Sequence, residues 1–196
     1  LAQALKSALA AHADPARAVP MQAYMKSAMP FHGVAAPLRR QLVAQTAAAF
    51  TLPEAAALAG TVLQLWREAT HREDRYAALD LLRLPRHRKL LTTALLPALQ
   101  EMIETGAWWD FCDEISGVAL ARLLQAEPAV MKPVLRQWAN GHSMWLRRAS
   151  MLSQRSLKSG VDAVLLYDTL LPSIAGGAFA DEFFIQKGMG WALRER

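Results

Sequence analysis

The chain has 196 residues, 53% of them hydrophobic, and a formal net charge of +5. This length supports a sizeable core in one or two domains. No window approaches the roughly 18 uninterrupted apolar residues of a membrane span, so no membrane span is expected. The single cysteine, Cys112, excludes a disulfide framework within the chain and a cysteine-based zinc site. The positive charge fits a polyanionic partner, although many basic proteins bind none.

Alanine and leucine dominate the sequence, which has only ten glycines, and this composition favours an all-α protein. Apolar residues recur with a helical period along nearly the whole chain. The predicted helices are residues 2–12, 16–29, 37–49, 53–69, 73–84, 88–104, 108–125, 128–140, 142–158, 161–173 and 179–196. Four prolines stand where a first helical turn tolerates this residue, namely Pro15, Pro37, Pro53 and Pro128. Asp14 is a candidate N-cap.

Three segments resemble one another loosely, each with an aromatic residue near its start, a basic residue, and then small and apolar residues. They are residues 75–80, 145–150 and 184–191. Their recurrence suggests HEAT-like helix pairs. Stacked pairs of this kind curve into a solenoid, and a concave basic face would suit a DNA duplex. We therefore predict one HEAT-like α-helical repeat domain over residues 1–196, with an irregular helical bundle as the alternative.

Two adjacent tryptophans precede two carboxylates in the stretch Trp108-Trp109-Asp110-Phe111-Cys112-Asp113. Residues three apart share one helical face, so the side chains of Asp110 and Asp113 can face the same space. Aromatic rings and a carboxylate together suit a cationic ligand or a positively charged transition state. The alternative is a structural one, in which Asp110 is an N-cap and Asp113 reaches back to the same helix end.

Other motifs give weaker signals. The five histidines, at positions 12, 32, 71, 87 and 142, do not pair with a metal ligand at a recognisable spacing. The sequence has no glycine-rich phosphate loop before a helix, and Cys112 is interpreted as a packing residue. Arg39-Arg40 and Arg147-Arg148 are adjacent pairs whose members point about 100° apart on a helix, so at most one of each faces a given site.

The chain resembles the DNA alkylation repair family of AlkD-like, HEAT-repeat DNA glycosylases over essentially its whole length. Six groups of residues carry the resemblance: Tyr24-Met25-Lys26 with Gly33; Ala36-Pro37-Leu38-Arg39-Arg40; Ala78-Leu79-Asp80; Trp108-Trp109-Asp110 with Asp113; Trp145-Leu146 with Arg148; and residues 183–187 with 190–195. The Trp-Trp-Asp-x-x-Asp and Phe-Ile-x-Lys-x-x-Gly-Trp-x-Leu-Arg-Glu segments are the most specific. Family members usually continue past the last motif, so the chain is expected to lack some C-terminal helices.

The resemblance implies a monofunctional hydrolase that excises 3-methyladenine and 7-methylguanine from duplex DNA without deep base flipping. It places Asp113, Trp109 and Trp191 in the catalytic cleft, with Arg148 close by. Asp113 would stabilise an oxocarbenium-like transition state and could orient water, and Arg148 would hold a phosphate. The residues expected to contact DNA are Tyr24, Lys26, Arg40, Arg147 and Lys187.

The implied reaction requires no cofactor and no metal, and we expect a monomer whose partner is double-stranded DNA with alkylated purines. Missing targeting signals and the implied substrate predict a location in the cytoplasm, at the nucleoid of a bacterium, and not at a membrane. Ala35 and Ala36 replace polar residues expected in some relatives, and Gly188 replaces a commoner alanine. Two other functions stay open: a non-catalytic HEAT-repeat module that binds DNA or an acidic partner, and a purely structural solenoid. The joint presence of the two cleft tryptophans, Asp113 and Arg148 favours the glycosylase.

Overall fold

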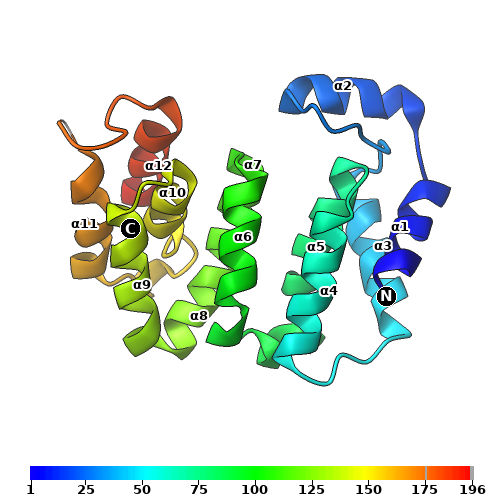
Figure 1. Cartoon of the computed structure of the whole chain (residues 1–196), viewed down its shortest axis with the longest axis horizontal. Coiled ribbons are helices and arrows are strands. Elements are labelled where there is room, and N and C mark those ends of the chain that lie inside the picture. Colours follow the sequence, from blue (N-terminus) through cyan, green and yellow to red (C-terminus); the bar gives the residue numbers. More distant parts are fainter. Residues whose placement is uncertain (175, 195–196) are drawn as a thin grey trace. The chain divides into compact units, whose positions relative to one another are not determined.

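The computed structural model describes residues 1–174 and 176–194, and these residues form helices and no strand (Figure 1). The predicted all-α class is therefore confirmed. The helices pack in two compact units, an N-terminal unit of Leu1–Leu90 and a C-terminal unit of Leu91–Arg196. The predicted concave basic face and the single domain stay predictions.

The N-terminal unit is built from five α-helices and one 3₁₀ segment. These are α1 (Ala2–Ala11), α2 (Pro15–Met25), α3 (Ala36–Ala48), α4 (Ala55–Arg67), α5 (Arg72–Arg83) and η1 (Pro85–Leu90). Helix α1 packs against α3, α4 and α5, and its Leu5 and Leu9 are completely buried. Helix α4 buries Leu58, Leu65 and Trp66 along one face. This apolar periodicity explains why these segments fold together.

The C-terminal unit is arranged around helix α10. Its elements are η2 (Thr93–Leu95), α6 (Leu96–Gly106), α7 (Trp109–Ile115), η3 (Ser116–Leu120), α8 (Ala121–Ala126), α9 (Pro128–Asn140), α10 (Met144–Leu152), η4 (Lys158–Gly160), α11 (Ala163–Leu170), η5 (Leu171–Ser173) and α12 (Phe183–Arg194). Helix α10 packs against α6, α7, α9, α11 and α12. Side chains on α10 can therefore reach residues of several other helices.

Most of the predicted helix starts are confirmed. Asp14 is the N-cap of α2 and accepts a hydrogen bond from the backbone N–H of Arg17 at 3.2 Å. Pro15 and Pro128 occupy the first positions of α2 and α9, where a missing N–H costs little. The prediction for Pro53 was wrong, because α4 begins only at Ala55.

Several predicted helices are shorter in the structure. Helix α2 ends at Met25 instead of residue 29, because Lys26 adopts a left-handed backbone with φ of 49°. The helix predicted for 88–104 begins at Leu96, and the one predicted for 142–158 ends at Leu152. The last helix begins at Phe183 instead of residue 179, and its predicted residues 195–196 lie outside the described residues.

The segment between α2 and α3 is fixed by a buried carboxylate on α5. Glu73 accepts hydrogen bonds from the backbone N–H groups of His32, Gly33 and Val34 at 2.8–3.1 Å. Gly33 has φ of +86°, and a Cβ there would lie 2.1 Å from the carbonyl oxygen of Asp14. Only glycine fits both the conformation and the space. The residues that follow Tyr24 and Lys26 are thus held firmly to the start of α5.

The helical stretch from α7 to α8 is interrupted by a single π-helical turn, Ser116–Leu120. π-turns of this kind often occur at functional sites. Gly117 in this turn allows the guanidinium of Arg155 to approach, because a Cβ there would lie 2.6 Å from it. The predicted helix over 108–125 therefore exists, with a local change of hydrogen bonding next to Asp113.

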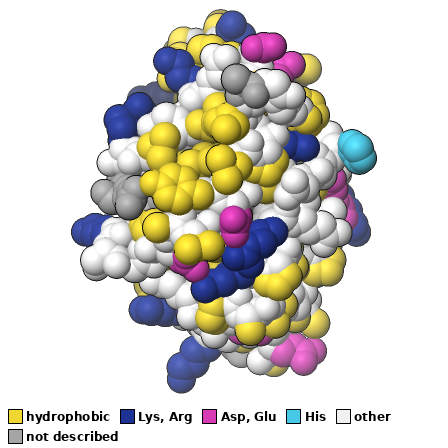
Figure 2. All heavy atoms as spheres, turned by 90° about the vertical axis from the view of Figure 1, so that its left-hand side faces the viewer, with side chains coloured by type: hydrophobic (Ala, Val, Ile, Leu, Met, Phe, Trp, Pro, Cys, Tyr) yellow, Lys and Arg dark blue, Asp and Glu magenta, His cyan; other side chains and the backbone are white. Residues whose placement is uncertain are grey.

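Exposed apolar side chains gather on α11 and η5, where Val164, Tyr167, Leu171 and Ile174 follow a helical spacing. Figure 2 shows hydrophobic side chains beside Lys and Arg side chains on the face that α11 occupies.

No helix in the described part of the chain is both long enough and apolar enough to cross a bilayer.

Candidate functional site

Asp113 lies in the second turn of α7 with only 5% of its surface exposed. Ala107 adopts a left-handed backbone that ends α6, and Trp108 is the extended N-cap from which α7 starts. Because the N-cap is Trp108, the alternative in which Asp110 caps the helix and Asp113 reaches back to it was wrong. The Asp113 carboxylate is directed instead to α10.

Arg148 on α10 holds the Asp113 carboxylate with two parallel hydrogen bonds. Its Nε donates to Oδ1 and its Nη2 to Oδ2, both at 2.8 Å. Its remaining nitrogen, Nη1, donates to the backbone carbonyl of Phe184 on α12. With 4% of its surface exposed, Arg148 connects α7, α10 and α12, and a fork of this kind fixes the orientation of a carboxylate.

Two opposing effects act on the pKa of Asp113. Burial raises the pKa because it disfavours the charged carboxylate, whereas the hydrogen bonds and charge of Arg148 lower it. The charge of Arg155 also lowers it, and that of Asp110 raises it. Burial is the largest effect, so the pKa of Asp113 lies above its ordinary value. Arg148 is the principal group that favours the ionised form.

Arg155 is a member of the site that the sequence did not predict. It follows α10, and its Nη2 donates to the backbone carbonyl of Asp113 at 2.9 Å. Its guanidinium also lies over the ring of Trp191 on α12, 4.4 Å from the ring centroid. Arg155 thus connects Asp113 to Trp191. The available sequence signal was Gly117, whose missing side chain leaves room for this guanidinium.

Aromatic rings surround the start of α7. Trp108, Trp145 and Phe184 form a cluster with ring centroids 5.2–6.4 Å apart. Trp109 is half-buried at the first position of α7, one helical turn before Asp113 and on the same face.

Cys112 is buried, and its thiol donates to the carbonyl of Trp145 at 3.4 Å. Burial raises the pKa of this thiol, which agrees with its interpretation as a packing residue.

The environments of Arg147 and Arg148 differ, as expected for neighbouring residues on a helix. Arg147 donates from Nε to the carbonyl of Gly141 at 2.8 Å and from Nη1 to the carbonyl of Pro172 at 3.1 Å. It is buried, so it fastens two turns of the C-terminal unit instead of presenting a free guanidinium for the predicted DNA contact. Lys187, in contrast, is exposed on α12.

The other predicted DNA contacts lie in the N-terminal unit. Tyr24, in the last turn of α2, is 77% exposed, and Lys26 is exposed directly after it. Arg40 has a side chain that is 52% exposed, whereas its neighbour Arg39 is buried against Asp80. Ala35 is the N-cap of α3 and makes no side-chain capping bond, in line with the polar group expected to be missing there.

The structure therefore defines an all-α protein of packed helices with a buried, arginine-held carboxylate beside tryptophan side chains. Comparison with protein families agrees with this description: the family described as "DNA alkylation repair enzyme" matches residues 5–196. The chain belongs to this family.

A solved structure supports the same fold. The chain is similar to a protein named "Predicted DNA alkylation repair enzyme from Enterococcus faecalis", with a TM-score of 0.77 and 26% sequence identity. The similarity covers 93% of this chain and 82% of that one. No curated protein sequence matches the chain significantly. Family membership supports an enzyme with a role in DNA repair.

Proposed function

We propose that the protein is a monofunctional DNA glycosylase that hydrolyses the N-glycosidic bond of positively charged alkylpurines, such as 3-methyladenine and 7-methylguanine, in duplex DNA. The observation that carries this proposal is the buried Asp113 carboxylate, held by both donors of the Arg148 fork close to the aromatic start of α7. The substrate class and the reaction are those that the family resemblance implies, and they suit the positive charge that such a carboxylate can stabilise.

Alkylation at N3 or N7 places a positive charge on the purine. When the bond between the base and C1′ breaks, its electron pair moves to the base, which leaves neutral, and positive charge develops on the sugar. A fixed carboxylate stabilises that charge more than it stabilises the starting state, which is the requirement for catalysis. Water then adds to C1′ and loses a proton. In this proposal, Asp113 stabilises the cation and orients that water.

The neighbouring residues have different proposed roles. Trp109 and Trp191 would contact the deoxyribose and the cationic base through their indole rings, and each contact of this kind contributes roughly 0.5–2 kcal/mol. Arg148 acts as a positioning residue, because its donors are directed to Asp113 and to the Phe184 carbonyl. This role differs from the phosphate contact that the sequence suggested. Tyr24, Lys26, Arg40 and Lys187 are exposed and remain the proposed contacts to the DNA backbone.

The test is release of 7-methylguanine from methylated duplex DNA by the wild type, Asp113→Asn and Asp110→Asn. Removal of one well-placed electrostatic group typically reduces the rate by about 10²–10³. We expect Asp113→Asn to lose about 10²–10³ in the rate of base release. Asp110→Asn is the matched control, because it removes one negative charge from the same helix, and its rate should fall by less than about tenfold. Equal release by wild type and Asp113→Asn would remove Asp113 from the reaction.

A non-catalytic DNA-binding module is the second candidate. The observation that favours it is that the charge of Asp113 is already compensated by Arg148. Under this alternative, the wild type binds methylated duplex DNA and releases no base. A binding measurement on the same DNA, at a stated salt concentration, therefore separates the two functions.

A further inference from the structure

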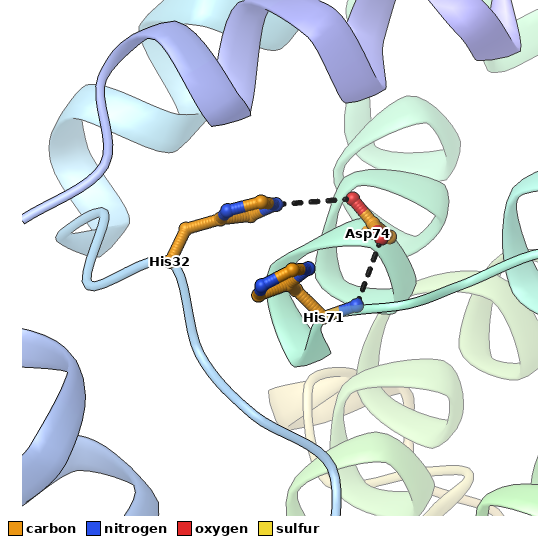
Figure 3. A group of neighbouring side chains, drawn as sticks. All are labelled: His32, His71 and Asp74. Carbon is orange, nitrogen blue, oxygen red and sulfur yellow. Dashed lines mark hydrogen bonds and ion pairs between the residues drawn. The ribbon is translucent and has the colours of Figure 1, made fainter. Parts of the chain in front are cut away.

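Two histidines and an aspartate meet in the N-terminal unit, although they are far apart in the sequence. His32 comes from the segment between α2 and α3, His71 is the N-cap of α5, and Asp74 lies in the first turn of α5. Figure 3 shows their side chains close together. One potential ligand atom from each residue lies within 4.8 Å of the other two. Histidine spacing in the sequence did not predict this cluster.

One oxygen of the cluster lacks a donor. Asp74 is completely buried, and its Oδ2 accepts hydrogen bonds from the N–H groups of Thr70 and His71, each at 3.0 Å. Among the described residues, no donor hydrogen-bonds to its Oδ1. The nearest candidate is Nε2 of His32, at 3.7 Å. A buried carboxylate oxygen without a donor is costly unless another positive group satisfies it.

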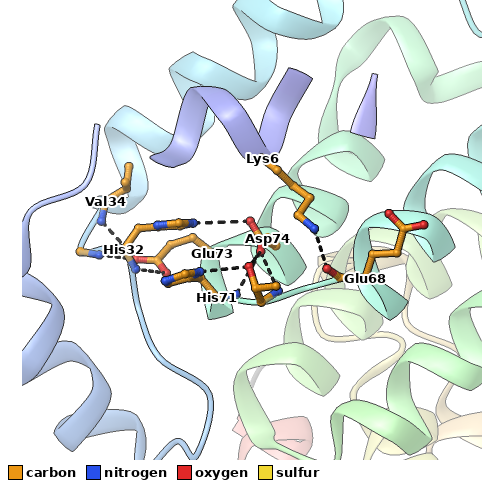
Figure 4. A network of polar contacts seen from close by, with 9 residues as sticks. Lys6, His32, Val34, Glu68, His71, Glu73 and Asp74 are labelled. Carbon is orange, nitrogen blue, oxygen red and sulfur yellow. Dashed lines mark hydrogen bonds and ion pairs between the residues drawn. The ribbon is translucent and has the colours of Figure 1, made fainter. Parts of the chain in front are cut away.

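The surrounding contacts leave this oxygen available while they hold the rest of the cluster. Glu73 is occupied by three backbone N–H groups of the segment that carries His32 (Figure 4). Nδ1 of His71 lies 3.1 Å from the hydroxyl of Thr70, which is itself 3.3 Å from Oδ2 of Asp74. Hydrogen bonds of this type orient a metal-ligating histidine and fix its tautomer.

We propose that His32, His71 and Asp74 form a binding site for a divalent transition-metal ion of the zinc type. Two imidazoles and one carboxylate are typical ligands of such ions, whereas magnesium and calcium prefer oxygen ligands alone. Three protein ligands leave one tetrahedral position for water.

The distance between His32 and Asp74 is close to what one ion requires. Two ligand bonds of about 2.0–2.2 Å at a tetrahedral angle separate their ligand atoms by roughly 3.4 Å, and Nε2 of His32 lies 3.7 Å from Oδ1 of Asp74. The imidazoles of His32 and His71 are stacked, with centroids 3.7 Å apart and planes inclined by 13°. Because a metal lies in the plane of each ligating ring, binding requires the rings to turn apart.

A bound ion would fasten the segment between α2 and α3 to the start of α5. That segment follows Tyr24 and Lys26, which are exposed and are proposed to contact DNA. The ion would act on the position and stability of this surface of the N-terminal unit, whereas Asp113 belongs to the C-terminal unit, so the metal proposal stands independently of the glycosylase reaction.

The experiment uses the whole chain, stripped of metal with a chelator and titrated with Zn²⁺ against a chromophoric competitor. His32→Gln removes one imidazole, and His71→Asn removes the other while it keeps a good N-cap for α5. His142→Gln, an exposed histidine of the C-terminal unit, is the matched control. We expect one tightly bound Zn²⁺ per chain in the wild type and the control, and at least about tenfold weaker binding in the other two variants.

Two further readouts keep the proposal testable if a variant folds poorly. Addition of Zn²⁺, but not Mg²⁺, should raise the Tm of the wild type and of His142→Gln. It should also shift the ¹⁵N resonances of two histidine rings in the wild type. The proposal is overturned if the wild type binds Zn²⁺ no more tightly than His32→Gln and His71→Asn, or if binding shifts no histidine ring.

Discussion

Each unit of the molecule contains a buried arginine–aspartate pair, and the two pairs differ in what surrounds the acid. In the N-terminal unit, Nε of Arg39 donates to Asp80 at 2.6 Å, and Arg40 lies 3.6 Å from the same carboxylate. In the C-terminal unit, Arg148 is the arginine that donates to the carboxylate of Asp113 among the residues that the structure describes. The pair geometry is similar, but the acid of the N-terminal unit has two arginines on its carboxylate.

A buried ion pair does not by itself identify a functional acid. Asp80 lies between two cations, and the guanidinium of Arg39 also covers the ring of Tyr76, 4.7 Å from its centroid. This arrangement favours a structural role, in which the pair fixes α3 against α5. Asp113 follows Trp109 by one helical turn, and burial, together with the charge of Asp110, raises its pKa and so opposes its ionisation. That environment is typical of a carboxylate used in chemistry.

The largest expected effect concerns stability, and it should be the same for both pairs. Breaking a buried pair by removal of one partner leaves an unpaired buried charge and costs about 3–5 kcal/mol. Asp80→Ala and Asp113→Ala should each lower the free energy of unfolding by about that amount. Urea unfolding followed by circular dichroism measures the loss. A loss below about 1 kcal/mol for one variant would show that its arginine finds other partners.

The rate of base release should differ between variants of the two arginine–aspartate pairs. At a temperature where both variants are folded, Asp113→Asn should lose about 10²–10³ in the rate of base release. Asp80→Asn should retain the rate within about tenfold, because Asp80 is not proposed to contact the reacting atoms. Single-turnover assays on 7-methylguanine DNA provide the comparison. Equal losses in both folded variants would show that the effect is not specific to Asp113 and would contradict its proposed role in the chemistry.

A smaller effect is expected in the pH dependence. Arg148 lowers the pKa of Asp113 against the effect of burial, so weakening their contact raises that pKa further. The proposed reaction needs the ionised carboxylate. On acidification, a variant with a weakened contact should therefore lose activity at a higher pH than the wild type does. Arg148→Lys keeps the positive charge but loses the two parallel guanidinium donors. The acidic limb of its pH–rate profile should lie at higher pH than that of the wild type. Arg40→Lys is the control, and an unmoved limb in Arg148→Lys would show that Arg148 does not govern this carboxylate.

The smallest effect is expected at two glycines of α12. Replacement of glycine by alanine in a helix interior stabilises it by about 0.5–1 kcal/mol. At Gly190 the added Cβ would lie 3.4 Å from the exposed Arg194, and at Gly188 it would lie 3.1 Å from the buried Arg148. Gly190→Ala should therefore gain more stability than Gly188→Ala. The difference in Tm measures how firmly Arg148 is held, and a larger gain at Gly188 would contradict a rigid pair.

The sequence by itself determined the local features of this protein. Apolar periodicity predicted the helices, and Asp14, Pro15 and Pro128 marked three of their starts, because capping and the first turn depend on neighbouring residues. Helical spacing also placed Trp109 one turn before Asp113. The sequence failed where the chain leaves the helix for local reasons without a strong signal, as at Lys26 after α2.

Only the tertiary structure decided which distant side chains meet. The Arg148–Asp113 pair spans 35 residues, and the contacts of Arg155 and the cluster of His32, His71 and Asp74 likewise join separate elements. Such contacts depend on how helices pack, which a local pattern does not specify. The same packing separated Arg147 from Arg148, since side chains 100° apart on α10 face different neighbours. The neighbours of each buried pair, rather than its residue types or its burial, therefore distinguish the acid proposed for chemistry from the acid that supports the fold.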